Sequence, residues 1–245
     1  MKTFISIFIA FTFFMGCAQK KQPIQGETEF QRELNAEFKD ASSSPLKDKD
    51  RKHFEGLDFF KFDAAYVVKA TFKRFPNETP FKMKTTTDRL PEYIKYGEVT
   101  FKLKGTTYRL NIYQNQELLM REGYEDYLFL PFLDKTNGIE SYGGGRYIDA
   151  RFPKGETMEI DFNKAYNPYC AYNEKYSCPM VPRENYLETR IEAGVKAFGK
   201  HYVLSFQPQY SVAVSVFSLI LERLKIRLNP KNPCQKKLCV THFVP

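Results

Sequence analysis

The sequence contains no tryptophan and only three histidines among its 245 residues. His201 and His242 lie near the C-terminal end, which leaves His53, in a charged segment, as the single histidine of the central part. Hydrolases of the Ser-His-Asp or Cys-His type need an imidazole positioned as a base. Metalloprotease, P-loop and dinucleotide-binding motifs are absent as well. These absences exclude the commonest enzyme signatures, and we expect no cofactor and no metal.

Long hydrophobic runs are also missing. The two longest, Phe4 to Met15 and Ser211 to Leu221, are shorter than the roughly 20 residues that a membrane-spanning helix needs. Hydrophobic residues nevertheless make up 42% of the chain and aromatic residues 16%. This composition excludes a disordered chain, which would be poor in both. We therefore expect one globular domain with appendages.

Excess charge is confined to the C-terminal end. The chain has 37 basic and 29 acidic residues, and residues 199–245 contain seven basic residues and one acidic residue. The stretch from Ala18 to Phe198 holds 29 basic and 28 acidic residues and is nearly neutral. A nucleic-acid-binding domain should carry its basic surface on the folded part. We therefore expect no nucleic acid partner.

The N-terminus has the features of a bacterial signal peptide. Lys2 precedes the apolar run, which ends in Phe14-Met15-Gly16-Cys17 and resembles a lipobox. The resemblance implies a signal peptide over residues 1–16, lipidation of Cys17 and a tether over residues 17–26. It also implies a membrane partner through the lipid anchor and a place in the cell envelope, on the outer membrane facing the periplasm. An ordinary secretory leader is the alternative.

Two short helices are expected after the tether. Phe30, Leu34 and Phe38 lie on one face of a helix spanning Thr28 to Asp40. Ser44, followed by Pro45, predicts the start of a second helix that ends near His53.

Alternating apolar residues then predict a series of strands. Lys104-Gly105 separates two of them and predicts a β-hairpin. Residues 147–152 and 157–162 are expected to form another strand pair around Pro153-Lys154-Gly155. The other predicted strands span residues 66–73, 127–132 and 187–193. The prediction is a mainly β domain over residues 27–198, an antiparallel sandwich or barrel with one or two short N-terminal helices.

Several strings in the central part are unusual: Leu128-Phe129-Leu130-Pro131-Phe132, Gly143-Gly144-Gly145-Arg146-Tyr147-Ile148-Asp149, Asp161 to Tyr172, Cys178-Pro179 and Glu184-Asn185. They resemble the bacterial domain-of-unknown-function family 1684, in its short Bacteroidetes-type lipoprotein form, over about residues 30–198. The resemblance implies an envelope setting and no established activity. Its pattern ends soon after Gly194. We expect the tail over residues 199–245 to dock loosely or to remain unpacked, and a shifted reading frame is the alternative.

Polar residues cluster between Arg146, at the start of the strand predicted over residues 147–152, and Asn185, which follows Cys178. The ligand-binding candidates are Arg146, Asp149, Asp161, Asn163, Tyr166, Asn167, Tyr172, Asn173, Glu184 and Asn185. Arg146 and Asp149 are three residues apart and should point to opposite faces of a strand. The same residue types also fix irregular loops by hydrogen bonding, which is the structural alternative.

Two functions remain open from the sequence. The first is a non-catalytic envelope lipoprotein that binds a small-molecule, glycan or protein ligand. The second is a hydrolase-like periplasmic enzyme that uses carboxylates such as Asp149, Asp161 or Glu184.

Cysteines form a final pattern. Once Cys17 is assigned to lipid, four of the five cysteines remain, and Cys170 and Cys178 lie close in sequence. An oxidising compartment favours a disulfide bond between them. Two reduced, buried thiols are the alternative.

Overall fold

The computed structural model describes residues 26–199. The predicted signal peptide, Cys17 and the tail from residue 200 lie outside the described residues. Two α-helices, α1 (Glu29–Lys39) and α2 (Asp48–Arg51), come first in the chain. The strands are β1 (Val67–Arg74), β2 (Phe81–Lys82), β3 (Glu92–Leu103), β4 (Thr106–Asn115), β5 (Tyr127–Asp134), β6 (Arg146–Arg151), β7 (Thr157–Asp161) and β8 (Tyr186–Leu187).

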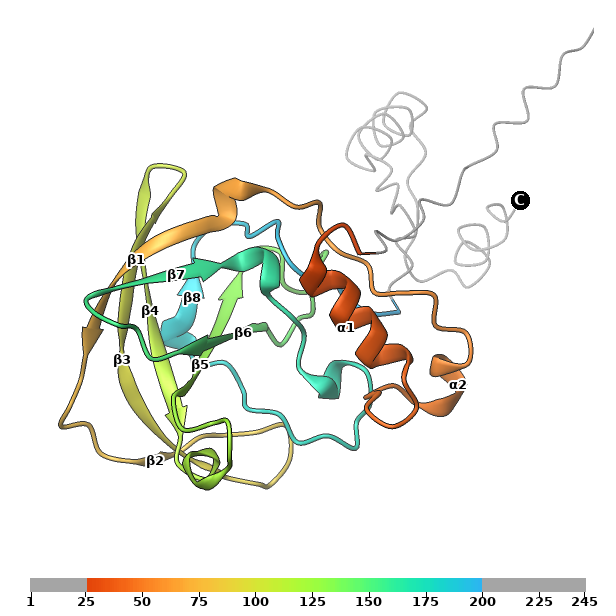
Figure 1. Ribbon diagram of the computed structural model, residues 1–245, viewed down its shortest axis with the longest axis horizontal. Helices are drawn as coiled ribbons and strands as arrows, with labels where there is room; N and C mark the ends of the chain where they lie inside the picture. The colour runs from red at the N-terminus through yellow and green to blue at the C-terminus, as the bar shows by residue number, and fades with distance from the viewer. Residues whose placement is uncertain (1–25, 200–245) are drawn as a thin grey trace, which may run out of the picture. The chain divides into compact units, whose positions relative to one another are not determined.

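The strands form one mostly antiparallel sheet that curls into a half-barrel (Figure 1), which confirms the predicted mainly β fold. The main strand order is β6-β5-β4-β3-β1-β7, with β2 paired to β3 and β8 paired in parallel to β5. Beyond α1 and α2, the described residues contain only 3-10 helices of three residues each, among them η3 (Phe162–Lys164) and η4 (Tyr169–Ala171), which follow β7. The two ends of this order, β6 and β7, are the two edges of the sheet.

The predicted hairpin is confirmed at β3 and β4. Lys104 and Gly105 both have positive φ, 49° and 84°, and they join Leu103 to its partner Thr106. A two-residue turn with positive φ at both positions matches the right-handed twist of the flanking strands. Glycine at the second position is favoured because it adopts this conformation without a Cβ clash.

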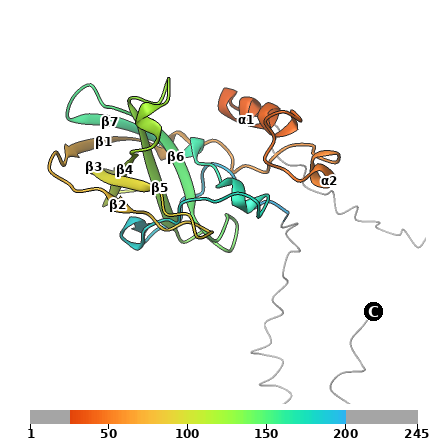
Figure 2. The ribbon, with the colours of Figure 1, turned by 90° about the horizontal axis from the view of Figure 1, so that it is seen from below.

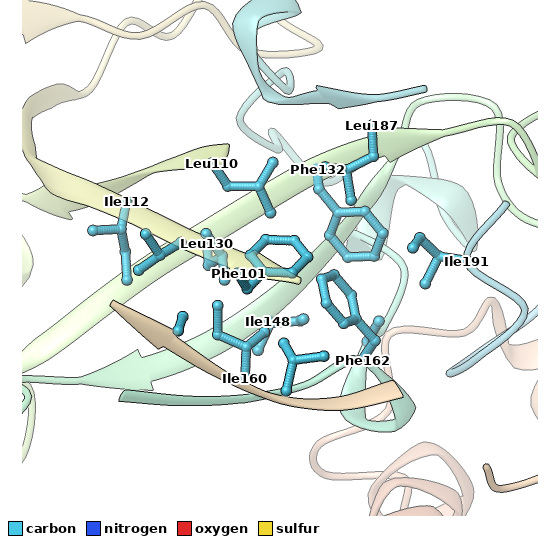
Figure 3. Packing of buried hydrophobic residues seen from close by; sticks show 14 of the residues in the cluster. Phe101, Leu110, Ile112, Leu130, Phe132, Ile148, Ile160, Phe162, Leu187 and Ile191 are labelled. Carbon is cyan, nitrogen blue, oxygen red and sulfur yellow. The ribbon is translucent and has the colours of Figure 1, made fainter. Parts of the chain in front are cut away.

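The inner face of the half-barrel is a filled apolar core (Figure 3). Alternation along the strands sends every second side chain inward, as the burial of Val99, Phe101 and Leu103 shows. The residues labelled in Figure 3 come from six strands, β3 to β8, and from the segments after β7 and β8: Phe101, Leu110, Ile112, Leu130, Phe132, Ile148, Ile160, Phe162, Leu187 and Ile191. The barrel interior is therefore packed with side chains and is not a wide ligand cavity.

Helix α1 (Glu29–Lys39) lies within one residue of the predicted boundaries at each end and is placed to one side of the sheet (Figure 2). Thr28 caps its first turn, and Gln31 bonds back to the Thr28 amide in a capping box. Phe38 is 1% exposed and packs edge-on against Tyr172, with 4.7 Å between ring centroids. The helix is thus joined to the segment that follows β7.

The predicted start of the second helix was wrong. Helix α2 begins at Asp48 instead of Pro45. Ser44 Oγ accepts a hydrogen bond from the Leu46 amide at 3.2 Å and donates one to the Phe38 carbonyl at 2.6 Å. Ser44 therefore closes the turn after α1 and does not cap α2.

Two strand predictions were also wrong. The strands at residues 147–152 and 157–162 exist, but they do not pair with each other: β6 pairs with β5, and β7 pairs with β1. The predicted strand over residues 187–193 is reduced to the two residues of β8. After Leu187 the chain is held by side chains instead, because Asp134 accepts from the Ile191 amide and Arg146 donates to the Ile191 carbonyl.

Candidate functional site

A groove lies where the two edges of the half-barrel, β6 and β7, face each other. Its volume is about 350 Å³, within the usual range for sites that bind small ligands. Its lining residues are Leu130, Ile148, Asp149, Ala150, Arg151, Pro153, Thr157, Met158, Glu159, Ile160, Asp161 and Lys164. We call this the β6–β7 groove. Two of the ten predicted ligand-binding residues, Asp149 and Asp161, line it.

The backbone of β6 presents polar groups to this groove. Tyr147 exchanges both backbone hydrogen bonds with Tyr166, on the side of β6 away from β5. In an antiparallel pair, the residues that face one edge alternate. The N–H and C=O groups of Asp149 and Arg151 therefore point to the same free side as those of Tyr147.

The backbone of β7 does the same from the opposite side. The Phe72 amide donates to the Glu156 carbonyl at 2.8 Å, so even-numbered residues of this segment face β1. The backbone groups of Thr157, Glu159 and Asp161 consequently face away from β1, toward the groove. Within residues 26–199, no strand pairing joins β6 to β7. Each wall of the groove thus offers a row of backbone donors and acceptors.

Both ends of the groove are closed. The Tyr147–Tyr166 backbone pair closes one end, at N···O distances of 2.9 and 3.0 Å. The connection over residues 152–156 closes the other, and Phe152 is fixed there by stacking on Tyr96, with 4.8 Å between ring centroids. Because both ends are fixed, the width of the groove is set by the fold.

Asp149 is an exposed carboxylate held by two tyrosines. Its Oδ1 accepts hydrogen bonds from the hydroxyls of Tyr127 at 2.7 Å and Tyr166 at 2.5 Å. Burial raises the pKa of both phenols, and the charge of Asp149 raises it further. The two hydroxyls therefore stay protonated and fix the carboxylate as an acceptor at the rim of the groove.

Asp161 is held by the turn that follows β7. Its Oδ1 accepts from the Asn163 backbone amide and from Asn163 Nδ2, both at 2.9 Å. This contact caps η3. Asp161 thus combines a capping role with a position on the groove wall.

Arg146 does not belong to the groove. Arg146 is the first residue of β6. Its side chain is 0% exposed and forms an ion pair with Asp134, whose side chain is also 0% exposed. Nη2 donates to Asp134 Oδ2 at 2.8 Å and to the Ile191 carbonyl at 2.7 Å, and Nη1 donates to the Ala193 carbonyl. Arg146 therefore joins β5, β6 and the segment after β8, and Asp149 points to the opposite face, as their spacing predicts.

The polar residues after Asp161 mainly hold the loop together. Asn163 is 4% exposed and bonds the backbone of Asp63 in both directions, at 3.0 and 3.1 Å. Asn167 Nδ2 donates to the Tyr172 hydroxyl and the Lys196 carbonyl. The side chain of Asn173 accepts from the Lys175 amide in a tight turn. These contacts match the structural alternative and not a shared binding pocket.

Glu184 and Asn185 lie outside the lining of the β6–β7 groove. Glu184 accepts from the Tyr113 hydroxyl at 3.1 Å. Asn185 is fully buried, bonds the Asn111 amide and carbonyl at 2.9 and 2.8 Å, and donates to the Pro131 carbonyl. Asn185 thus links β4 to β5. Of Arg146, Asp161, Asn163, Tyr172 and Glu184, Asp161 alone is in the lining of the β6–β7 groove.

Several groove residues were missed from the sequence. Arg151, Glu159 and Lys164 were not among the candidates, although Glu159 and Asp161 are two residues apart, as are Asp149 and Arg151. That spacing puts each pair on one face of a strand. The signal was available, but it pointed to a site only once β6 and β7 were known to be the sheet edges.

The two cysteines of the central part meet in space. The Cys170 amide donates to Cys178 Sγ at 3.2 Å, and the Tyr142 hydroxyl lies 3.9 Å from Cys170 Sγ. Both are free thiols in the structure, so the predicted disulfide bond is not formed there. The hydrogen bond from the Cys178 thiol lowers the pKa of Cys170 to about 6.

Metal-binding clusters and membrane-spanning helices were both sought in the described part of the chain. Within residues 26–199, no group of three or more His, Cys, Asp or Glu side chains is placed to hold a metal ion. In the same residues, no helix has the length and apolarity needed to cross a membrane.

Comparison with known proteins gives one family and a related structure. The family described as "Protein of unknown function (DUF1684)" matches residues 52–196. The solution NMR structure of an uncharacterized protein from Haloarcula marismortui is 32% identical, with a TM-score of 0.56. The similarity covers 70% of this chain and 92% of the archaeal one. None of the curated proteins matches the chain.

Proposed function

This chain belongs to the DUF1684 family of proteins of unknown function, and from that premise we propose that its domain is a binding module that holds its ligand in the β6–β7 groove. The observation that carries the proposal is the pair of free strand edges across a preformed groove. Backbone groups that face the groove provide directional hydrogen bonds, and the half-buried side chains of Ala150, Pro153 and Met158 provide an apolar lining. Such a combination of apolar lining and a few polar groups is typical of ligand sites.

The arrangement of the carboxylates favours binding over hydrolysis. Of the three candidates for an enzyme, Asp149 and Asp161 line the groove, whereas Glu184 does not. Hydroxyl donors hold Asp149, and amide donors hold Asp161. A hydrolase of the two-carboxylate type needs one protonated carboxyl as a general acid. Donors aimed at both carboxylates stabilise acceptors instead.

The groove can be tested by filling it. Ala150 is half-buried and lines the groove, so Ala150→Phe should occupy the space of a ligand. In a ligand-observed NMR screen of small amines, sugars and short peptides, at least one class should bind the native protein and lose binding to this variant. Ala41→Phe, a matched change at an exposed alanine outside the groove, should keep it. The proposal is wrong if nothing in the panel binds, or if binding survives Ala150→Phe in a folded variant.

We further propose that the chain is a cell-envelope lipoprotein anchored through Cys17, on the outer membrane facing the periplasm. The support is the apolar run that ends in Gly16-Cys17. Acylation at the new N-terminus places several chains in the bilayer, which gives lasting anchorage. In such a compartment the adjacent Cys170 and Cys178 thiols would be oxidised to a disulfide bond.

Cys17→Ser should release the protein from membranes of its native host. Mass spectrometry of the native mature form should find Cys17 as an acylated N-terminal residue, and the serine variant should appear in the soluble fraction. A soluble native form that begins at another residue would contradict the anchor and leave the ordinary secretory leader.

A further inference from the structure

We infer that Cys170 and Cys178 form a redox site that reduces small hydroperoxides, with Cys170 as the attacking thiol and Cys178 as the resolving thiol. The inference goes beyond the ligand groove and does not depend on it. Its basis is the arrangement of the two sulfur atoms and of the Tyr142 hydroxyl beside them.

The two thiols differ in exposure and in charge state. Cys170 is half-buried, whereas Cys178 is 7% exposed. The hydrogen bond that the Cys178 thiol donates to Cys170 lowers the pKa of Cys170 and, together with burial, raises the pKa of Cys178. At neutral pH Cys170 is therefore a thiolate, the form that attacks peroxides, and Cys178 keeps its proton.

Backbone contacts hold Cys178 against Cys170. The Cys170 amide donates to Cys178 Sγ at 3.2 Å. Thr86 fixes Cys178 in turn, because the Cys178 amide donates to Thr86 Oγ1 at 3.1 Å and the Thr86 amide donates to the Cys178 carbonyl at 2.9 Å. A sulfenic acid formed at Cys170 would therefore have a resolving thiol beside it, which protects it from further oxidation.

Tyr142 supplies a hydroxyl donor next to the attacking sulfur. Its oxygen lies 3.9 Å from Cys170 Sγ. Burial and the charge of Cys170 raise the pKa of Tyr142 to about 12, so the hydroxyl stays protonated at neutral pH. A peroxide that reaches the sulfur comes within reach of the same hydroxyl, which can stabilise the charge on the departing oxygen.

The glycine run before β6 lets Tyr142 take this position. A Cβ atom at Gly144 would lie 2.5 Å from Cε1 of Tyr142, so a larger residue there would displace the ring. At Gly143, an added Cβ atom would meet the Gly138 Cα atom at 3.7 Å, which is ordinary van der Waals contact. Gly144 is therefore a positioning residue for Tyr142, and Gly143 is not.

The reaction balances in two steps. The Cys170 thiolate attacks the terminal oxygen of the hydroperoxide, the O–O bond breaks, and a sulfenic acid forms while the departing oxygen takes a proton and leaves as an alcohol, or as water from hydrogen peroxide. The Cys178 thiol then attacks the Cys170 sulfur, the S–O bond breaks, and water leaves as the disulfide bond forms. Two thiols are thus oxidised for each hydroperoxide reduced, and an external dithiol restores them.

The test uses the full-length chain with Cys17, Cys234 and Cys239 replaced by serine, which leaves the pair as its only thiols. The reduced protein is mixed with hydrogen peroxide at pH 7, and mass spectrometry follows the products. We expect one disulfide bond per peroxide consumed, at a rate about tenfold or more above that of free cysteine, because the thiolate and the hydroxyl donor act together.

Single replacements in the same background separate the two thiols. In Cys178→Ser, oxidation should stop at the sulfenic acid, which dimedone traps on Cys170. In Cys170→Ser, the remaining Cys178 should react no faster than free cysteine. Circular dichroism checks that both variants are folded, and equal dimedone labelling of the two would overturn the assigned roles.

A matched pair of glycine variants tests Tyr142 without removing either thiol. Tyr142→Phe and Gly144→Ala should each slow the reaction with peroxide by about fivefold or more, since each takes the hydroxyl away from the departing oxygen. Gly143→Ala should stay within about twofold of the parent rate, because its Cβ atom meets only ordinary contacts. Equal rates in all three variants would overturn the role of Tyr142.

The outcomes distinguish a peroxide site from a purely structural disulfide. If the pair reacts with peroxide only as fast as free cysteine, the inference is wrong and the disulfide is structural. If oxidised glutathione at the same concentration oxidises the pair as fast as hydrogen peroxide, the site exchanges disulfides and the inference is again wrong. Neither result affects the β6–β7 groove, which the Ala150→Phe variant tests separately.

Discussion

Replacing Arg146 by alanine is expected to reduce the free energy of unfolding by about 3–5 kcal/mol, as the removal of one partner from a buried ion pair typically does. The change leaves the Asp134 carboxylate in the core without its counter-ion. It also removes the donors to the Ile191 and Ala193 carbonyls. The guanidinium lies 5.1 Å from the centroid of the Phe132 ring, so packing against that ring is lost as well.

Arg151→Ala is the matched control for this prediction, because it is the same change on the same strand. Arg151 pairs with Asp126 on the surface, where their side chains are 54% and 49% exposed. Exposed pairs contribute about 1 kcal/mol or less. Urea unfolding of both variants gives the two free energies with comparable slopes. Equal losses in the two variants would show that Arg146 does not hold the core.

Oxidation of the purified protein should join Cys170 to Cys178 and raise its stability. Oxidised glutathione accepts the two electrons: the two thiols become one disulfide bond, and two molecules of reduced glutathione are released. Closing so short a loop is worth about 2–3 kcal/mol by the chain-entropy model. Urea unfolding before and after oxidation measures the gain, and non-reducing peptide mapping identifies the bond.

Cys170→Ser is the control, since it retains Cys234 and Cys239 and therefore any contribution from them. Oxidation of this variant should not raise its free energy of unfolding, because the Cys170–Cys178 loop cannot close. In the reduced native protein, the lowered pKa of Cys170 makes its thiol largely ionised above pH 6, so iodoacetamide should label Cys170 rapidly at pH 7. Two thiols that remain free after oxidation, or equal gains in both proteins, would contradict the disulfide.

The parts of the fold that depend on local sequence were predictable. The β3–β4 hairpin follows from alternation on both sides of Lys104-Gly105, and α1 follows from the Phe30, Leu34 and Phe38 stripe. Each depends on residues within about 15 positions of one another. The mainly β class was predictable for the same reason, because it follows from many such local patterns.

The pairing of β6 and β7 was not predictable in this way. A connection of five residues between two strands is typical of a hairpin, yet β7 pairs with β1, about 90 residues earlier in the chain. No local feature of Thr157 to Asp161 distinguishes these partners. Because the groove exists only between unpaired edges, the candidate site could not be placed from the sequence.

Arg146 shows the same limit for a single residue. Its position next to three glycines and three residues before an aspartate favoured a ligand site. Along the strand, however, it lies on the same face as Ile148 and Ala150, which point inward. Its partner Asp134 comes from β5, twelve residues earlier, where the sequence shows only the end of an apolar strand.

The placement of the two sheet edges also affects the tendency of the protein to aggregate. Exposed strand edges invite edge-to-edge pairing between copies, and natural proteins protect them with charges or covering segments. Here both edges turn toward each other, the Tyr147–Tyr166 pair and residues 152–156 close the ends, and carboxylates line the rim. Two copies that approached edge to edge would bring like charges together. Repulsion between these charges therefore disfavours edge-to-edge pairing of the domain with a second copy.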